Sequence, residues 1–206
     1  MGLVICRYGE IALKGQNRGM FESMLVGNIE RALKAHKLDA KVKRLRGRVF
    51  VYSNNIGGLV KCLKKVFGLV SVSPAVECGL DMKKIKKTVL DLLKDKQFET
   101  FRITTRRPNK KFELNSNEVD VDVGAFIVSE LDKTVKLKDQ DLDVGIEIHD
   151  AAYIFTEKVD GPGGLPVGMS GNVLCFVEDE KDLLAAWLMM KRGCKVFLAG
   201  TADIDT

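Results

Sequence analysis

The chain has 206 residues, of which 46% are hydrophobic and 30% charged, and its formal net charge is +5. This length accommodates one large domain or two small ones, and the composition is that of an ordinary globular protein. No run of apolar residues approaches the roughly 18 that a membrane-spanning helix needs, and the N-terminus lacks the pattern of a secretory signal. We therefore expect a cytoplasmic protein with no membrane partner.

Alternating strand and helix patterns fill the first 78 residues. The helix at 17–35 is the clearest, because apolar side chains recur there every three or four residues. A hairpin follows whose turn is strongly cationic, with Lys43, Arg44, Arg46 and Arg48. The order strand, helix, strand, strand, helix, strand is that of the ferredoxin-like unit. The remaining expected elements are strands at 2–8, around 42, at 49–52 and at 69–78, and a helix at 59–67.

A second group of elements occupies residues 79–168. Ser116 is a suitable helix N-cap with Glu118 in the first turn, and Val119, Val123 and Ile127 recur on one face of the helix that follows. The glycines of the stretch 161–168 are typical of a linker with a freely adaptable backbone. The other expected elements are a helix at 82–93, strands at 99–105, 142–148 and 152–156, and a turn at 108–111.

Residues 169–206 have the pattern of one parallel strand, helix, strand unit, with strands at 173–177 and 195–198 and a helix at 181–191. The apolar face of this helix is too large to remain exposed and too small to form its own core. We expect it to dock on the second unit or on a second copy of the chain, which would make a homodimer. The face consists of Leu183, Leu184, Trp187 and Leu188.

The charge is distributed unevenly along the chain. Residues 1–111 carry 25 Lys and Arg against 9 Asp and Glu, and the remainder carries 8 against 19. A basic half indicates a polyanionic partner, because neutralised phosphates and released counterions supply most of the affinity in nonspecific nucleic-acid binding. The alternative is a solvated basic surface without a nucleic-acid partner.

The cysteines do not indicate a metal site. They are odd in number, form no C-x-x-C pair and are accompanied by only two histidines, so we expect no structural zinc. Cys6 and Cys175 lie in apolar runs and are expected to behave as small buried hydrophobic residues. The five are Cys6, Cys62, Cys78, Cys175 and Cys194.

Four motifs in order resemble the tRNA 4-thiouridine synthetase family. They are R-Y-G-E-I-A-L-K-G at 7–15, F-R-I-T-T-R-R-P-N-K-K-F at 101–112, G-I-E-I at 145–148 and G-P-G-G-L-P-V-G at 161–168. The resemblance implies an α/β (α+β) fold, with a ferredoxin-like domain at 1–78, a THUMP domain at 79–168 and, at 169–206, the remnant of a PP-loop type α/β domain. It also implies that the first two domains bind tRNA for modification by a following adenylation domain.

The predicted RNA contacts are basic residues near the quoted motifs. Arg102 and Arg106 share one strand face with Thr104, and the cations that follow them complete a compact patch suited to phosphate oxygens. Few aromatic residues accompany the patch, so we expect recognition of backbone and shape rather than base stacking. Glu10 is instead expected to serve an internal ion pair. The predicted contacts are Arg7, Lys14, Lys43, Arg46, Arg102, Arg106, Arg107, Lys110 and Lys111.

The sequence departs from the family at the nucleotide loop. The family has S-G-G-x-D-S, whose glycines let backbone N–H groups surround pyrophosphate, whereas this chain has Glu178, Asp179, Glu180, Lys181, Asp182 and Leu183. Carboxylates beside a tetra-anionic ligand cost on the order of several kcal/mol. We therefore expect no cofactor, no catalytic residue and no metal. An acidic helix start is favoured over a metal site at these carboxylates.

Three functions are compatible with these features. The leading one is a THUMP-type protein that binds tRNA and presents it to a catalytic PP-loop or sulfur-carrier partner. The second is a non-catalytic component of a tRNA sulfurtransferase whose adenylation domain lies on another chain. The third is a basic ferredoxin-like module for a small ligand or a protein, which would bind without tRNA preference and with little salt dependence.

Overall fold

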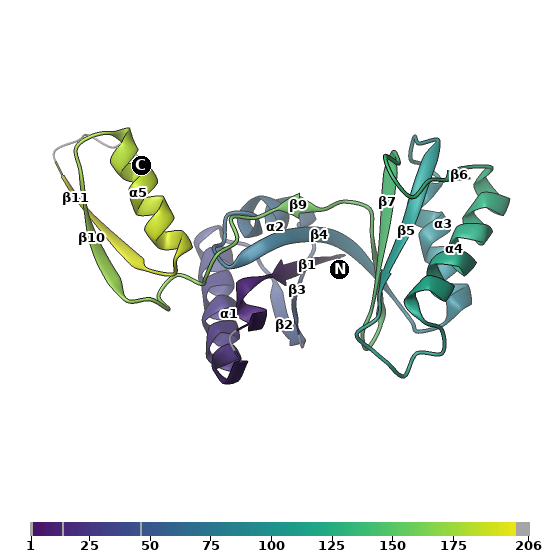
Figure 1. The fold of residues 1–206 in the computed structure, drawn as a ribbon, viewed down its shortest axis with the longest axis horizontal. Coiled ribbons are helices and arrows are strands. Elements are labelled where there is room, and N and C mark those ends of the chain that lie inside the picture. Colours follow the sequence, from purple (N-terminus) through teal and green to yellow (C-terminus); the bar gives the residue numbers. More distant parts are fainter. Residues whose placement is uncertain (1, 14, 46, 201–206) are drawn as a thin grey trace. The chain divides into compact units, whose positions relative to one another are not determined.

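The computed structural model describes residues 2–13, 15–45 and 47–200, and these form two compact units (Figure 1). Unit 1 combines Met1–Val72 with Val159–Thr206, and unit 2 is Ser73–Lys158. Strand β4 (Leu69–Cys78) begins in unit 1 and ends in unit 2. Each unit has its own hydrophobic core.

The sheet of unit 1 has the strand order β2-β3-β1-β4. Strand β3 pairs antiparallel with both β1 and β2, and the short β9 pairs with the first half of β4. Together with the two helices between them, these strands give the ferredoxin-like order that the sequence predicts, and the α/β fold class is confirmed. The bounds are β1 (Gly2–Tyr8), β2 (Lys41–Leu45), β3 (Arg48–Ser53) and β9 (Val159–Asp160).

Helices α1 (Arg18–Ala35) and α2 (Ile56–Leu63) cover this sheet. Leu25, Ile29 and Leu33 form the buried strip of α1, as their spacing predicts. Helix α2 begins three residues earlier than expected, because the side chain of Asn55 accepts a hydrogen bond from the N–H of Gly58 at 2.9 Å. Two 3-10 turns, η1 (Glu10–Leu13) and η2 (Gly15–Asn17), precede α1.

The cysteine thiols are free in the described structure. Cys6 is fully buried in the core of unit 1, and burial raises its pKa to about 12. It therefore remains a neutral thiol that packs as an apolar side chain, which confirms the prediction. The same prediction was wrong for Cys175, which is only half-buried on β10.

The sheet of unit 2 consists of the second half of β4 followed by β8, β7, β5 and β6. Strand β5 is parallel to β7 and β6, and β8 is antiparallel to β7 and β4. Helices α3 (Met82–Leu93) and α4 (Ser116–Leu131) contact each other and cover one face of this sheet (Figure 1). The bounds are β5 (Thr100–Arg106), β6 (Thr134–Val135), β7 (Leu142–Ile148) and β8 (Ala152–Phe155).

Helix α4 is capped one residue earlier than predicted. Asn115, not Ser116, is the N-cap: its Oδ1 accepts from the N–H of Glu118 at 3.1 Å, and its own N–H donates to Glu118 Oε2 at 2.7 Å. This reciprocal pair is a capping box. Ser116 is thereby the first helical residue.

The C-terminal segment of unit 1 contains β10 (Asn172–Val177), α5 (Glu180–Lys191) and β11 (Lys195–Gly200), with the two strands parallel. The stretch 161–168, expected to be a linker, is held to the first half of β4 by backbone hydrogen bonds. Trp187 of α5 packs edge to face against Phe67, with ring centroids 5.5 Å apart. The parallel unit predicted from the sequence is thus confirmed. Among the described helices, none is long and apolar enough to cross a bilayer.

Candidate nucleic-acid interface

The excess of positive charge lies in unit 1. Its residues, 1–72 and 159–206, carry 18 Lys and Arg against 11 Asp and Glu, whereas residues 73–158 carry 15 against 17. Unit 2 can therefore attract a polyanion only where its cations are gathered and not neutralised by neighbouring acids.

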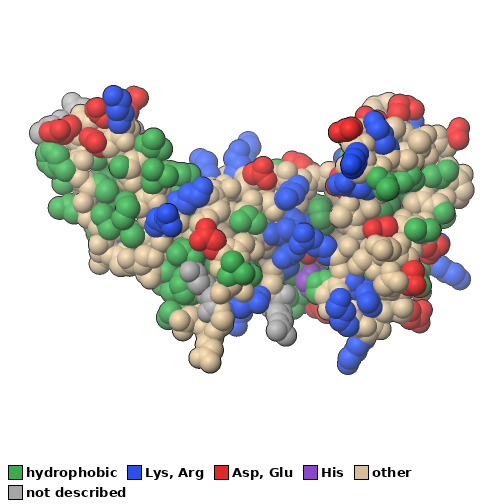
Figure 2. Space-filling view, in the orientation of Figure 1, with side chains coloured by type: hydrophobic (Ala, Val, Ile, Leu, Met, Phe, Trp, Pro, Cys, Tyr) green, Lys and Arg blue, Asp and Glu red, His purple; other side chains and the backbone are tan. Residues whose placement is uncertain are grey.

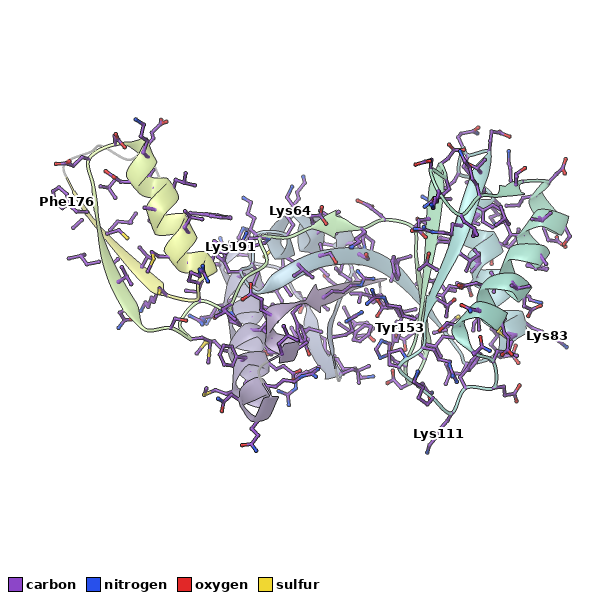
Figure 3. The ribbon with its side chains drawn as sticks, in the orientation of Figure 1. Lys64, Lys83, Lys111, Tyr153, Phe176 and Lys191 are labelled. Carbon is purple, nitrogen blue, oxygen red and sulfur yellow. The ribbon has the colours of Figure 1, made fainter. Side chains whose placement is uncertain are left out.

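In unit 2, exposed cations gather at the last residue of β5 and in the loop that follows it, which together we call the tip loop (residues 106–112). Arg106, Lys110 and Lys111 are exposed to solvent. Lys111 projects from the loop in Figure 3, and Figure 2 shows basic side chains at the same end of the unit. The structure therefore brings three exposed cations together within six residues, and their role in binding phosphate stays a prediction.

The tip loop is fixed by hydrogen bonds at both its centre and its ends. The side chain of Asn109 donates to the carbonyl of His149 at 2.8 Å, and its N–H donates to the carbonyl of Ile148 at 3.1 Å. Arg107 donates from Nη1 to the carbonyls of Lys110 at 3.2 Å and Phe112 at 2.8 Å. Arg107 thus shapes the loop from inside, and the neighbouring lysines remain available to an anion.

Arg102, unlike the exposed cations of the tip loop, is paired with an acidic residue. It lies on the same face of β5 as Arg106, as predicted, but it forms an ion pair with Asp143 on β7 and donates to the carbonyl of Leu137 at 3.1 Å. The hydrogen bond to Asp143 and the charge of that residue raise the pKa of Arg102. Thr104 also donates to Asp143, at 2.8 Å. The charge of Arg102 is therefore largely compensated within the sheet.

The predicted contacts of unit 1 lie in several environments. Arg7 is only 8% exposed, which leaves little of its side chain for an RNA contact, and Lys43 is half-buried on β2. Lys14 and Arg46 lie outside the described residues.

Unit 1 also has a cationic hollow that includes Arg18, a residue that was not among the predicted contacts. A hollow of about 460 Å³ between the start of α1 and β2 is lined by Arg18, Gly19, Glu22, Arg44 and Leu45. Arg18 Nε lies 2.7 Å from Glu22 Oε1, and Arg44 Nη1 lies 3.9 Å from Glu22 Oε2. The signal in the sequence was an arginine four residues before a glutamate at a helix start.

The acidic run after β10 is a helix start. Asp179 is the N-cap of α5, and the N–H groups of Glu178 and Asp179 donate to Asp182 Oδ2 at 2.8 and 3.2 Å. These backbone donors lower the pKa of Asp182. The donors that a phosphate would need are thus occupied by side chains of the same segment. In the described part of the chain, no group of three or more His, Cys, Asp or Glu is arranged to hold a metal.

Two family models match the chain in succession: the ThiI ferredoxin-like domain at residues 3–73 and the THUMP domain at residues 80–157. A crystal structure of PH1313 from Pyrococcus horikoshii is 39% identical, with a TM-score of 0.91 over all of this chain and 70% of that one. The chain belongs to the family that joins these two domains. The resemblance inferred from four motifs is confirmed for both domains.

The chain is also similar to part of some longer proteins. A probable tRNA sulfurtransferase of Caldanaerobacter subterraneus is 39% identical over 197 residues, covering 94% of this chain and 52% of the relative. A crystal structure of a 4-thiouridine synthetase in complex with RNA and bound ATP is 30% identical, with a TM-score of 0.80 over 97% of this chain and 52% of that chain. The chain thus spans about half the length of these relatives.

Proposed function

We propose that the ThiI-type ferredoxin-like domain and the THUMP domain of this chain together bind tRNA and present it for modification. The similarity to tRNA sulfurtransferases indicates that the modification is the formation of 4-thiouridine. The observation that carries the proposal is the tip loop: a structured loop of the THUMP domain with three exposed cations, in a chain whose solved relative was crystallised with RNA. Fixed cations bind phosphates without first paying the entropy of ordering the loop.

The binding mode follows from the side chains available. Arg106, Lys110 and Lys111 contact phosphates, and Arg107 holds the loop that carries them. Such contacts position a folded RNA by its backbone and shape, without base sequence being read. Arg102 and Arg7 contribute little, because one is paired with Asp143 and the other is buried. Lys14, Lys43 and Arg46 remain predicted contacts of unit 1.

The chemistry is supplied by a partner in this proposal. The segment that would form the nucleotide loop is a capping box of carboxylates, which opposes binding of ATP phosphates. A PP-loop protein or a sulfur-carrier protein is the expected partner. Co-purification of the native chain with a separate PP-loop protein supports this arrangement. Melting at a higher temperature in millimolar magnesium ATP contradicts it.

The C-terminal segment has an open apolar surface, which Figure 2 shows over β10, β11 and α5. Leu174, Phe176 and Phe197 are 71%, 60% and 47% exposed, although parallel strands are ordinarily covered on both faces. Acidic residues follow β10, whereas Lys191, Arg192 and Lys195 lie from the last residue of α5 to the first residue of β11. A two-fold axis would place the acidic end of one copy beside the basic end of the other.

We propose that a second copy of the chain covers this surface. Light scattering then gives the mass of a dimer, and Leu174→Asp with Phe176→Asp gives a folded monomer. A monomeric wild-type chain contradicts the homodimer.

The tRNA proposal is tested by anisotropy titration of an unmodified tRNA transcript and of a duplex DNA of similar length across a salt series. We expect submicromolar affinity for tRNA, preference over DNA, and a steep decrease with salt because phosphate contacts release counterions. Weak binding without preference contradicts the proposal and favours the basic ligand-binding module.

A further inference from the structure

A second cationic site lies in unit 1, at the hollow between α1 and β2. Glu22 is 8% exposed and stands at its base. Glu22 Oε1 accepts hydrogen bonds from the hydroxyl of Tyr8 and from Arg18 Nε. A buried carboxylate with two donors on one oxygen is a rigid anchor for the groups around it.

The ionisation of this anchor is set by its partners. Burial by itself would raise the pKa of Glu22, but the hydrogen bonds from Tyr8 and Arg18 and the charges of Arg18 and Arg44 lower it overall. Burial, followed by the hydrogen bond to Glu22, raises the pKa of Tyr8. Tyr8 is therefore a protonated donor and Glu22 a carboxylate at neutral pH.

Two guanidinium groups stand above the anchor. Arg18 donates from Nε to Glu22 and from Nη2 to the hydroxyl of Tyr8, the latter at 3.3 Å. Both hydrogen bonds therefore come from one edge of the guanidinium group. Arg44 lies on β2, and its Nη1 donates to Ser23 Oγ of α1 at 3.3 Å. Both arginines keep exposed surface, with side-chain accessibilities of 27% and 46%.

We propose that Arg18 and Arg44 form a fork that binds one backbone phosphate of the RNA, with Glu22 and Tyr8 as positioning residues. The inference rests on the proposed function and adds a second attachment point to it. Two arginines stand beside one carboxylate in the lining, so the hollow retains a net positive charge. Guanidinium groups suit phosphate because they offer several N–H donors in a fixed plane.

The test is titration of the tRNA transcript with the full chain carrying Arg18→Met and Arg44→Met. We expect affinity at low salt to decrease about 10-fold and the slope of log K against log salt to become shallower by about one. Arg31→Met is the matched control, because Arg31 is an exposed arginine on the same helix. It should change affinity less than 2-fold.

Glu22→Gln tests the positioning role separately. It keeps both arginines but removes the charge that orients them, so affinity should decrease about 3-fold to 5-fold while the salt slope stays at the wild-type value. Arg44→Met alone, which leaves the Tyr8, Arg18 and Glu22 bonds intact, keeps the proposal testable should the double variant unfold.

The outcomes separate the two proposals. If wild-type protein does not prefer tRNA, the proposed function fails. If wild-type protein binds tRNA, and charge reversal of Arg106, Lys110 and Lys111 lowers affinity while the folded Arg18 and Arg44 variants keep it, only the fork is overturned. The fork is also overturned if Arg31→Met lowers tRNA affinity as much as Arg18→Met with Arg44→Met does. The loss would then follow from the reduced positive charge of the protein and not from a specific site.

Discussion

The two units differ in how far their cations are balanced by acidic residues. Unit 1 carries 18 Lys and Arg against 11 Asp and Glu, whereas unit 2 carries 15 against 17. In unit 2, Lys86 is paired with Asp122, Lys133 with Glu99 and Arg102 with Asp143, while the cations of the tip loop stay exposed. Net charge alone therefore does not show which cations are neutralised by a neighbouring acid, whereas these ion pairs of unit 2 do.

The strongest test of this comparison reverses the charge of the exposed tip-loop cations. Arg106→Glu with Lys110→Glu and Lys111→Glu should lower tRNA affinity about 100-fold at low salt, because three phosphate contacts become repulsions. The control is Lys83→Glu with Lys87→Glu, two exposed lysines on α3 of the same unit. Equal losses in both variants would show that the charge of unit 2, and not the tip loop, determines affinity.

A smaller effect is expected when the tip loop is loosened without a change in charge. Asn109→Ala removes the side-chain bond to the carbonyl of His149 and should cost about 1 kcal/mol of stability. Affinity for tRNA should decrease about 5-fold at an unchanged salt slope, because the same cations must now be ordered on binding. An unchanged affinity, measured by the same titration, would mean that the loop need not be preformed.

In unit 1 we expect Glu22 to contribute to the free energy of unfolding. Glu22→Gln should lower the free energy of unfolding by about 1–3 kcal/mol at pH 7, because a nearly buried hydrogen-bonded carboxylate is replaced. The pKa of Glu22 is lowered by folding, so its contribution is complete above the unfolded value of about 4.3 and is lost as pH falls below it. Urea unfolding at pH 7 and pH 3.5 should show the variant losing less stability than the wild type on acidification. A parallel loss in both proteins would exclude Glu22 as the titrating group.

The smallest effect is expected at Arg102. Because its charge is compensated by Asp143, Arg102→Met should change tRNA affinity less than 3-fold, even though it lies on the same strand face as Arg106. A 10-fold loss with an unaltered melting temperature would show that the ion pair opens to bind RNA.

The elements were predicted well where periodicity is local. The expected ranges of β1, β4, α3 and β7 agree with the structure at both ends. The two-residue strands β6 and β9 were not predicted, because they exist only through pairing with distant strands. Ser116 was chosen over Asn115 as the N-cap because both are suitable residue types and only the bonds to Glu118 distinguish them.

The site was predicted less completely, because the state of a cation depends on residues far away in the sequence. Arg102 meets Asp143, 41 positions later, and no local pattern marks that pair. The burial of Arg7 follows from its place in a covered strand. The tip-loop lysines, in contrast, are exposed because they lie in a turn, which the sequence does reveal.

The central claim is that tRNA meets the exposed tip loop of unit 2. Ultraviolet crosslinking of the native chain to a tRNA transcript, followed by mass spectrometry of the crosslinked peptides, tests it most directly. We expect crosslinks within residues 106–112, which free duplex DNA should not compete away at equal concentration. Crosslinks confined to α3 or to residues 172–200 would contradict the claim.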